Sequence, residues 1–212
     1  MSPRVPTYLI TPFCLAIFSN FKKLIFACNC LIKFRLLSLN KQLLIHCISM
    51  QYNAKIPFTV ETHWQIEEVL DGDSIIICHR FTGLRKEIRL YGLDAPEVKI
   101  NRKMKEDEEK SSLPAQLLMQ FGLQSLHFVL SVAPPKTVVT IITEQENYYD
   151  YWNRQLGYVI LPGGLCLNEL LLINGYAKAT PQYYCGQLAA YQMMNRQAQL
   201  NGIGIYSQVK VF

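Results

Sequence analysis

Two aspartates stand where a chain can offer carboxylates to a cation. Asp73 closes an Asp-Gly-Asp turn at 71–73, and Asp94 opens an Asp-Ala-Pro-Glu loop at 94–97. Each lies at or just after the end of a segment with strand character, beside a turn, where a carboxylate reaches solvent. Hard oxygen ligands of this kind suit Ca²⁺ or Mg²⁺ better than zinc. The pair therefore indicates a site for one hard divalent cation.

Three further residues match the needs of phosphodiester hydrolysis. Glu97 ends the same loop, Arg89 lies on the segment just before it, and Arg154 precedes a later strand-like segment. A metal ion and two arginines would neutralise the developing oxyanion, and the glutamate would handle the attacking water. Each motif alone also has an ordinary structural meaning as a turn, a loop or a solvent-facing arginine. The residues alone leave both interpretations open.

The segments around these residues have the pattern of strands. β-Branched and aromatic residues dominate them, some alternate with charged residues, and turn signals such as Asp-Gly-Asp, Thr-Gly and Pro-Gly-Gly separate them. The first three are close enough in sequence to predict successive antiparallel strands. The expected strands are residues 58–70, 74–78, 85–91, 136–143 and 155–161.

Three helices are expected around these strands. The first begins at Ser111 or Ser112 as its cap, has Pro114 in its first turn and ends at the Pro-Pro pair 134–135. The others are 168–174, closed by a glycine at 175, and 186–200. The highly charged segment 98–110 predicts a mobile surface loop. Five short strands and an intervening helix favour a small closed antiparallel barrel with helices packed against it.

Residues 1–49 differ in kind from the rest. They hold six of the 21 basic residues and no acidic residue, so 15 basic side chains face 16 acidic ones after them. The net charge of +5 therefore gives no argument that the body binds nucleic acid. Their apolar runs, 8–18 and 24–32, are shorter than the roughly 18–20 residues that span a bilayer.

Three interpretations of residues 1–49 stay open: a secretory or anchoring leader, a mis-assigned start with translation from Met50, and a structural extension. The domain itself is expected at 58–206. Its location is expected to be cytoplasmic if translation starts at Met50, and otherwise exported or membrane-associated.

The order of the motifs resembles that of the staphylococcal nuclease-like (thermonuclease) family. The resemblance rests on Asp-Gly-Asp-Ser at 71–74, Ile-Arg-Leu-Tyr-Gly-Leu-Asp-Ala-Pro-Glu at 88–97 and Asp-Tyr-Trp-Asn-Arg at 150–154. It continues through 164–177 and covers residues 62–206. It implies a five-stranded OB-fold barrel with about three packed helices. It also implies a Ca²⁺-dependent endonuclease acting on DNA and RNA.

The resemblance assigns roles to individual residues. Asp73 and Asp94 would be metal ligands, together with the backbone carbonyl of Ala95. Glu97 would be the general base or would orient the attacking water. The scissile phosphate would be bound by the two arginines, Arg89 and Arg154.

The chain departs from the family pattern before its second arginine. The usual Tyr-Gly is here Trp152-Asn153. Asn153 tolerates the left-handed backbone that a glycine would adopt there. Trp152, Tyr183 and Tyr184 are candidate nucleic-acid-binding residues, because base–aromatic stacking contributes ~1–3 kcal/mol per base whatever the sequence. Packing under the last helix is the alternative role for the two tyrosines.

A binding module is the rival function. OB-type barrels also hold single-stranded nucleic acid or a protein partner without cleaving anything. The intact set of two aspartates, one glutamate and two arginines favours the enzyme. The expected substrate is DNA and/or RNA, single strands favoured, and the chain is expected to be a monomer. Membrane association through 1–49 is an alternative.

Overall fold

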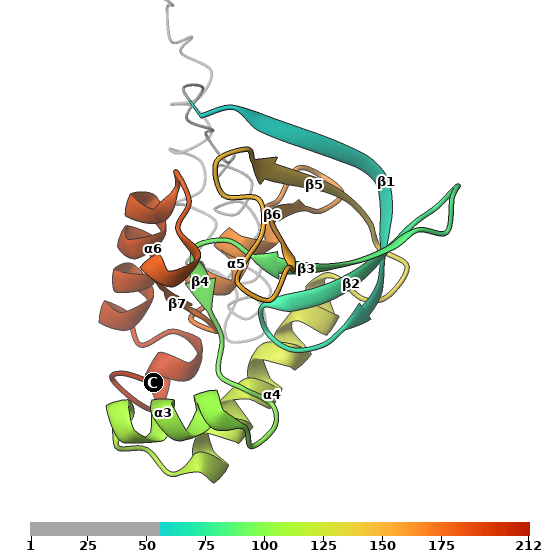
Figure 1. Ribbon diagram of the computed structural model, residues 1–212. Helices are drawn as coiled ribbons and strands as arrows, with labels where there is room; N and C mark the ends of the chain where they lie inside the picture. Colours follow the sequence, from blue (N-terminus) through green and yellow to red (C-terminus); the bar gives the residue numbers. More distant parts are fainter. Residues whose placement is uncertain (1–55) are drawn as a thin grey trace, which may run out of the picture. The chain divides into compact units, whose positions relative to one another are not determined.

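The computed structural model describes residues 56–212. The expectations for 1–49 lie outside these residues. Five strands close into a barrel in the order β1-β2-β3-β6-β5 (Figure 1). This confirms the predicted five-stranded barrel. The strands are β1 (Phe58–Val69), β2 (Ser74–His79), β3 (Arg85–Leu90), β5 (Val138–Glu144) and β6 (Gln155–Ile160).

Strand β1 closes the barrel because it pairs with two partners. Its first part pairs with β5 and its second with β2, both antiparallel. The register shifts between Glu61 and Trp64 on the β5 side and between Ile66 and Glu68 on the β2 side. Such bulges bend a strand and increase its twist. Trp64 and Ile66, which follow the first bend, are buried in the barrel core.

One strand pair corrects the sequence prediction. β3 and β6 are parallel, with Ile88 opposite Gln155 and Arg89 opposite Leu156, whereas an antiparallel barrel was expected. The reason is the connection: the chain leaves β3, passes through two helices and β5, and returns along β6 in the same direction. In this register Arg154, which precedes β6, lies beside Glu87, with its Nη1 atom 3.6 Å from the Glu87 carboxylate. Glu87 and Arg89 lie on the same face of β3, because alternate residues of a strand share a face.

A helix replaces the loop that was expected at 98–110. α3 (Arg102–Ser111) begins at Asn101, whose side chain accepts a hydrogen bond from the Met104 amide at 2.8 Å. An asparagine at this position satisfies an otherwise unpaired amide of the first turn. Met104 is buried, so the helix also has an apolar anchor. The expectation of a loop was wrong because the charge of the segment hid both signals.

Because α3 forms, the residue that caps the next helix, α4, differs from the expected one. Ser112 has a left-handed backbone, φ 56°, and ends α3 by donating its amide to the Glu108 carbonyl. Pro114 then takes the cap position of α4 (Ala115–Val132), so neither Ser111 nor Ser112 caps that helix as expected. α4 ends before the Pro-Pro pair, as predicted.

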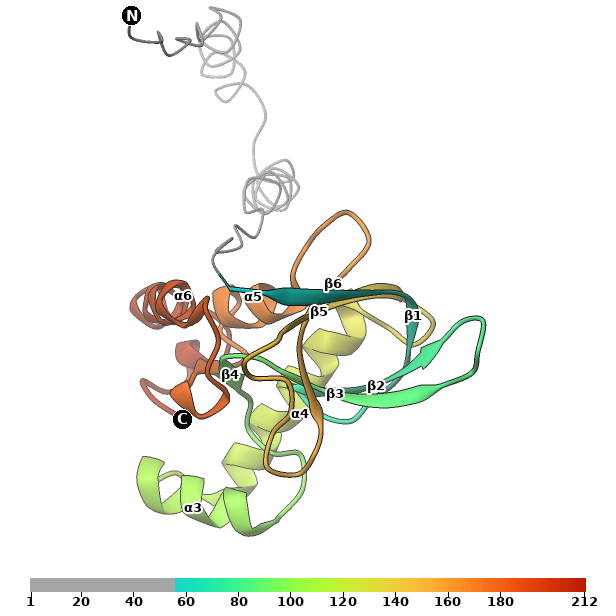
Figure 2. The same cartoon turned by 45° about the horizontal axis from the view of Figure 1, so that its top comes forward.

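Helices α3, α4 and α6 (Leu188–Leu200) share an apolar cluster beside the barrel, and Figure 2 shows α3 joined to the lower end of α4. Met104 of α3 and Phe121 of α4 lie in this cluster together with the last residue, Phe212. Its buried members are Met104, Leu118, Phe121, Ala198, Ile205, Tyr206 and Phe212.

The remaining elements are short. The two-residue strands β4 (Leu93–Asp94) and β7 (Lys178–Ala179) pair with each other between the barrel and α6. Two 3₁₀ turns lie at η1 (Pro181–Tyr183) and η2 (Gly204–Ser207).

Helix α5 (Leu167–Ile173) is largely buried, and one polar side chain of it, Asn168, hydrogen-bonds the backbone of the barrel. Asn168 donates to the carbonyls of Tyr91 and Gly157, both at 3.2 Å, and accepts from the Val159 amide at 3.2 Å. Its amide therefore satisfies three backbone groups of the barrel at the point where β3 and β6 meet.

Asn168→Ala is expected to lower the free energy of unfolding by about 3 kcal/mol, because three buried backbone groups each lose a hydrogen bond, although the Gly157 carbonyl keeps another, from the Tyr91 amide. Urea denaturation followed by circular dichroism measures it. Asn201→Ala, on an exposed residue at the end of α6, should change stability by no more than about 0.5 kcal/mol. Equal midpoints for the two variants would contradict this role of Asn168.

In the part of the chain described here, no helix combines the length and hydrophobicity that crossing a membrane requires. Its cysteines, Cys78, Cys166 and Cys185, are free thiols.

Candidate active site

The turn between β1 and β2 holds Asp73 against the loop that follows β4. A Cβ atom on Gly72 would lie only 2.6 Å from the Ala95 Cβ and 2.7 Å from the Ser125 Cβ, so only glycine allows this approach. Asp71 shapes the turn by accepting from the Asp73 amide at 2.9 Å. The Ala95 amide then donates to Asp73 Oδ2 at 2.6 Å. Two segments that are distant in sequence are thereby joined at the aspartate.

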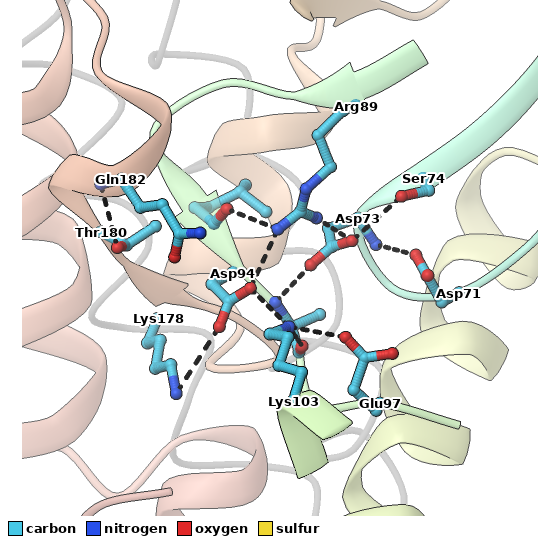
Figure 3. Close-up of polar contacts among 12 residues, drawn as sticks. Asp71, Asp73, Ser74, Arg89, Asp94, Glu97, Lys103, Lys178, Thr180 and Gln182 are labelled. Carbon is cyan, nitrogen blue, oxygen red and sulfur yellow. Dashed lines mark hydrogen bonds and ion pairs between the residues drawn. The ribbon is translucent and has the colours of Figure 1, made fainter. Parts of the chain in front are cut away.

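The loop 94–97 is placed by a second close approach. A Cβ atom on Gly122 of α4 would overlap the backbone of Pro96 and Glu97. The loop can therefore lie directly on the helix. At its start, Asp94 belongs to β4 and pairs with Lys178 of β7. The two carboxylates of this loop, Asp94 and Glu97, turn toward one another across a shared cationic group (Figure 3).

Arg89 lies between the two aspartates. Its guanidinium forms ion pairs with Asp73 and, at 2.9 Å, with Asp94 (Figure 3). The arginine side chain is only 2 % exposed. The Tyr183 ring covers it, with the guanidinium carbon 4.2 Å from the ring centroid. Within residues 56–212, Arg89 Nε has no hydrogen-bond partner, so one buried donor of this guanidinium is still available to an anion.

A lysine that the sequence analysis did not single out lies in the centre of the site. Lys103 Nζ is 2.7 Å from Asp94 Oδ1 and 2.7 Å from Glu97 Oε1, and it donates to the Ala95 carbonyl at 3.3 Å. A second lysine, Lys178, has its ammonium 3.6 Å from Asp94 Oδ2. Asp94 is therefore surrounded by three cationic side chains.

The charges of this cluster hold each other in the ionised form. Burial disfavours the charged form of Asp94, but Lys103, Arg89 and Lys178 outweigh burial and lower the pKa of that carboxyl below its ordinary value. Burial likewise opposes the charge of Lys103, and the carboxylates of Asp94 and Glu97 overcome it and raise the pKa of the lysine. At Asp71 burial prevails over the nearby cations, so its pKa is raised.

The second arginine reaches the same site from the other side. Arg154 Nε pairs with Asp150 at 2.7 Å, and Arg154 Nη1 donates at 3.4 Å to the Ser74 hydroxyl, which donates in turn to Asp73. Asn153 has φ 61°, the left-handed backbone that the sequence analysis expected it to tolerate. The turn is thus formed with Trp152-Asn153, and it connects Arg154 to Asp73 through one hydroxyl.

The three aromatic candidates differ in exposure. Trp152 is 61 % exposed and Tyr184 is 59 % exposed, and both present apolar rings to solvent. Tyr183 is 5 % exposed, and one face of its ring already packs on the Arg89 guanidinium. The first two could stack on a base directly, whereas Tyr183 lies beneath the surface.

The donor set suits a hard cation. Asp73, Asp94 and the Ala95 carbonyl supply only oxygen atoms, and the last two already turn toward one cationic group, the Lys103 ammonium. Among the side chains of residues 56–212, no three His, Cys, Asp or Glu converge as a ready-made metal cluster. Asp73, Asp94 and the Ala95 carbonyl are instead linked through Arg89 and Lys103, so basic side chains contact the oxygens that are expected to hold a metal.

The five residues predicted from sequence to act in hydrolysis, Arg89, Glu97, Arg154, Asp73 and Asp94, are all connected in this network. Sequence reasoning missed Lys103 because it lies in the segment taken for a solvent-exposed loop. The signal that could have found it is Asn101, a helix-capping residue that places a lysine on the first turn, beside the loop of Glu97.

Comparison with known proteins agrees with this geometry. The model of the family described as "Staphylococcal nuclease homologue" matches residues 87–208, which include Arg89, Asp94, Glu97 and Arg154. Endonuclease YhcR of Bacillus subtilis (strain 168) is 31 % identical over 119 residues, which are 56 % of this chain and 9 % of that protein.

An uncharacterized endonuclease of Escherichia coli O157:H7 is 28 % identical over 123 residues, which are 58 % of this chain and 64 % of that protein. The chain thus spans less than two thirds of either relative. The match to the family model, however, covers more than half of the chain. This chain belongs to the staphylococcal nuclease homologue family.

Proposed function

We propose that the chain is a metal-dependent endonuclease that hydrolyses phosphodiester bonds of DNA and/or RNA. The observation that carries the proposal is the bridge made by Arg89 between Asp73 and Asp94, with Glu97 on the same loop. A guanidinium donor, oxygen ligands for a cation and a carboxylate base together can supply the charge stabilisation and the activated water of this reaction. The endonuclease names of the relatives support the same class of activity.

Asp73, Asp94 and the Ala95 carbonyl are the residues that would hold one Ca²⁺. Bound there, the ion would act as a Lewis acid on the phosphoryl group and stabilise its developing charge. Because these two carboxylates lie next to Arg89, the bound ion and the guanidinium would contact the scissile phosphate side by side.

Arg89 and Arg154 bind the phosphate in this proposal. Arg89 offers Nε, and Arg154 lies at the more exposed edge, with 23 % of its side chain open to solvent. Glu97 takes a proton from the attacking water or orients it. Its side chain is 20 % exposed, so water can reach the carboxylate.

The proposal includes a preference for single strands. Trp152 and Tyr184 are exposed aromatic residues on segments next to Arg154 and Arg89, respectively. The Trp152 ring lies 5.3 Å from the Arg154 guanidinium carbon. Unpaired bases present faces that such rings can stack on, whereas paired bases do not.

We expect cleavage of a single-stranded oligonucleotide to require Ca²⁺ and to stop in excess chelator, because the carboxylates of Asp73 and Asp94 repel a phosphate unless a divalent cation lies between them. Asp94→Asn should raise the Ca²⁺ concentration for half-maximal rate by at least ~10-fold, since even outer-shell changes cost ~10–100-fold in metal affinity. Gel electrophoresis of end-labelled DNA measures both.

Glu106→Gln is the control, because Glu106 is an exposed residue of α3 that pairs with Arg102, outside the proposed ligand set. Its Ca²⁺ requirement should stay unchanged. Full cleavage in excess chelator would contradict a metal-dependent mechanism. Binding of the oligonucleotide without cleavage under any Ca²⁺ concentration would favour the binding module instead.

A further inference from the structure

The ammonium of Lys103 contacts the oxygens that face the proposed cation. Asp94 Oδ1 and Glu97 Oε1 each lie 2.7 Å from Nζ, and the Ala95 carbonyl lies 3.3 Å from it (Figure 3). A lysine ammonium has three donors, so these three oxygens satisfy it. Two of the three, from Asp94 and Ala95, are in the ligand set proposed for Ca²⁺. The lysine and the ion therefore need the same atoms.

Basic side chains already compensate most of the charge of the cluster without a metal ion. Four carboxylates are ion-paired with three basic side chains: Asp73, Asp94, Glu97 and Asp107 with Arg89, Lys103 and Lys178. A divalent ion added to this set would leave an uncompensated positive charge in a largely buried place, which is unfavourable. Binding of the ion is therefore coupled to the departure of a basic group.

Lys103 is the basic group that can leave. Arg89 is 2 % exposed, ion-paired with both aspartates and held under Tyr183, so its side chain cannot turn out into solvent. Lys178 is as exposed as Lys103, 31 %, but its ammonium lies 3.6 Å from the Asp94 carboxylate, against 2.7 Å for Lys103 at the start of α3. The helix is anchored through the neighbouring Met104, which is 1 % exposed. The lysine side chain can thus turn into solvent while α3 stays in place.

We propose that Lys103 is a tethered cation that competes with the divalent ion for Asp94 and Ala95. In the absence of metal it neutralises the carboxylates and keeps the site closed to the ion. Its displacement sets the Ca²⁺ concentration at which the site fills, and it also frees Glu97 from an ion pair. This inference rests on the Ca²⁺ site of the proposed function.

Calorimetric titration of the full chain with CaCl₂ tests it. Lys103→Met keeps the length of the side chain and removes its charge, so it should bind Ca²⁺ more tightly by at least ~10-fold, within the ~5–150-fold range of coupled binding events. Lys103→Arg should bind no more tightly than the parent. Lys105→Met, on an exposed lysine of the same helix, is the matched control and should leave the affinity unchanged.

Stability gives a second measurement on the same variants. In chelator, Lys103→Met should melt at a lower temperature than the parent, because Asp94 and Glu97 lose their shared partner. Saturating CaCl₂ should raise its melting temperature more than that of the parent. Equal Ca²⁺ affinity of parent and Lys103→Met would overturn the competition alone. Absence of Ca²⁺ binding in both would overturn the Ca²⁺ site of the proposed function, and the competition with it.

Chemical labelling of the parent protein needs no variant. Acetylation by acetic anhydride, read by mass spectrometry, should be slow at Lys103 in chelator and rise several-fold in saturating CaCl₂. Acetylation of Lys105 should be the same in both. Continued protection of Lys103 while calorimetry shows bound Ca²⁺ would mean that the lysine and the ion do not compete.

Discussion

Glu97→Gln is expected to slow cleavage of a single-stranded oligonucleotide by at least ~100-fold, because general-base catalysis contributes typically ~10²–10⁴-fold. The amide cannot take a proton from water. It still has an oxygen that can accept from Lys103 and Asn101, the two partners of the native carboxylate, so the loop should keep its place. Single-turnover cleavage in Ca²⁺ measures the rate.

Binding separates this role from a structural one. The negative charge of Glu97 should repel a phosphate, so the glutamine variant should bind the oligonucleotide in Ca²⁺ at least as tightly as the parent, as measured by fluorescence anisotropy. Glu109→Gln, on an exposed residue of α3, should change neither quantity. An unchanged cleavage rate in Glu97→Gln would remove this carboxylate from the mechanism.

The second large effect is expected at the arginines. Arg89→Lys and Arg154→Lys should each reduce the cleavage rate by roughly 10²–10³-fold, the usual cost of losing a donor aimed at developing charge. Lysine carries the charge but cannot form the two-pronged contact of a guanidinium. At position 89 it also cannot bridge Asp73 and Asp94 as the native side chain does.

Arg102→Lys is the control, because Arg102 is 94 % exposed on α3. Its cleavage rate should equal that of the parent. Thermal melting of all three variants shows whether a loss of rate accompanies a loss of fold. A crippled Arg89→Lys beside a fully active Arg154→Lys would mean that Arg154 shapes the turn with Asp150 and does not bind the phosphate.

Local patterns in the sequence predicted most of the barrel. Strands β2, β3 and β6 begin and end within two residues of the expected segments, because turn residues with few alternative conformations separate them. The five residues proposed for hydrolysis could also be named in advance. These residues lie in short, contiguous motifs, and those at 71–74 and 88–97 meet where Ser74 of β2 pairs with Arg89 of β3.

The features that could not be predicted depend on contacts between distant segments. The parallel pairing of β3 and β6 follows from the path of the intervening helices, which no short window of sequence contains. The position of Lys103 depends on α3 forming and on Met104 reaching a cluster with Phe121 and Phe212. The burial of Tyr183 depends on the hydrogen bond from the Gly92 amide to its carbonyl, at 2.7 Å.

The parallel pairing also bears on the folding of the protein. Arg89 and Arg154 belong to segments far apart in the chain, and they meet only when β6 docks on β3. Contacts of such long sequence separation form late and slowly, because a large loop must be closed first. A chain that has formed only β1, β2 and β3 therefore does not yet have Arg154 in place beside Arg89. In the proposed mechanism both arginines are in place only after the barrel has closed, so we expect an incompletely synthesised or partly folded chain to lack the proposed activity.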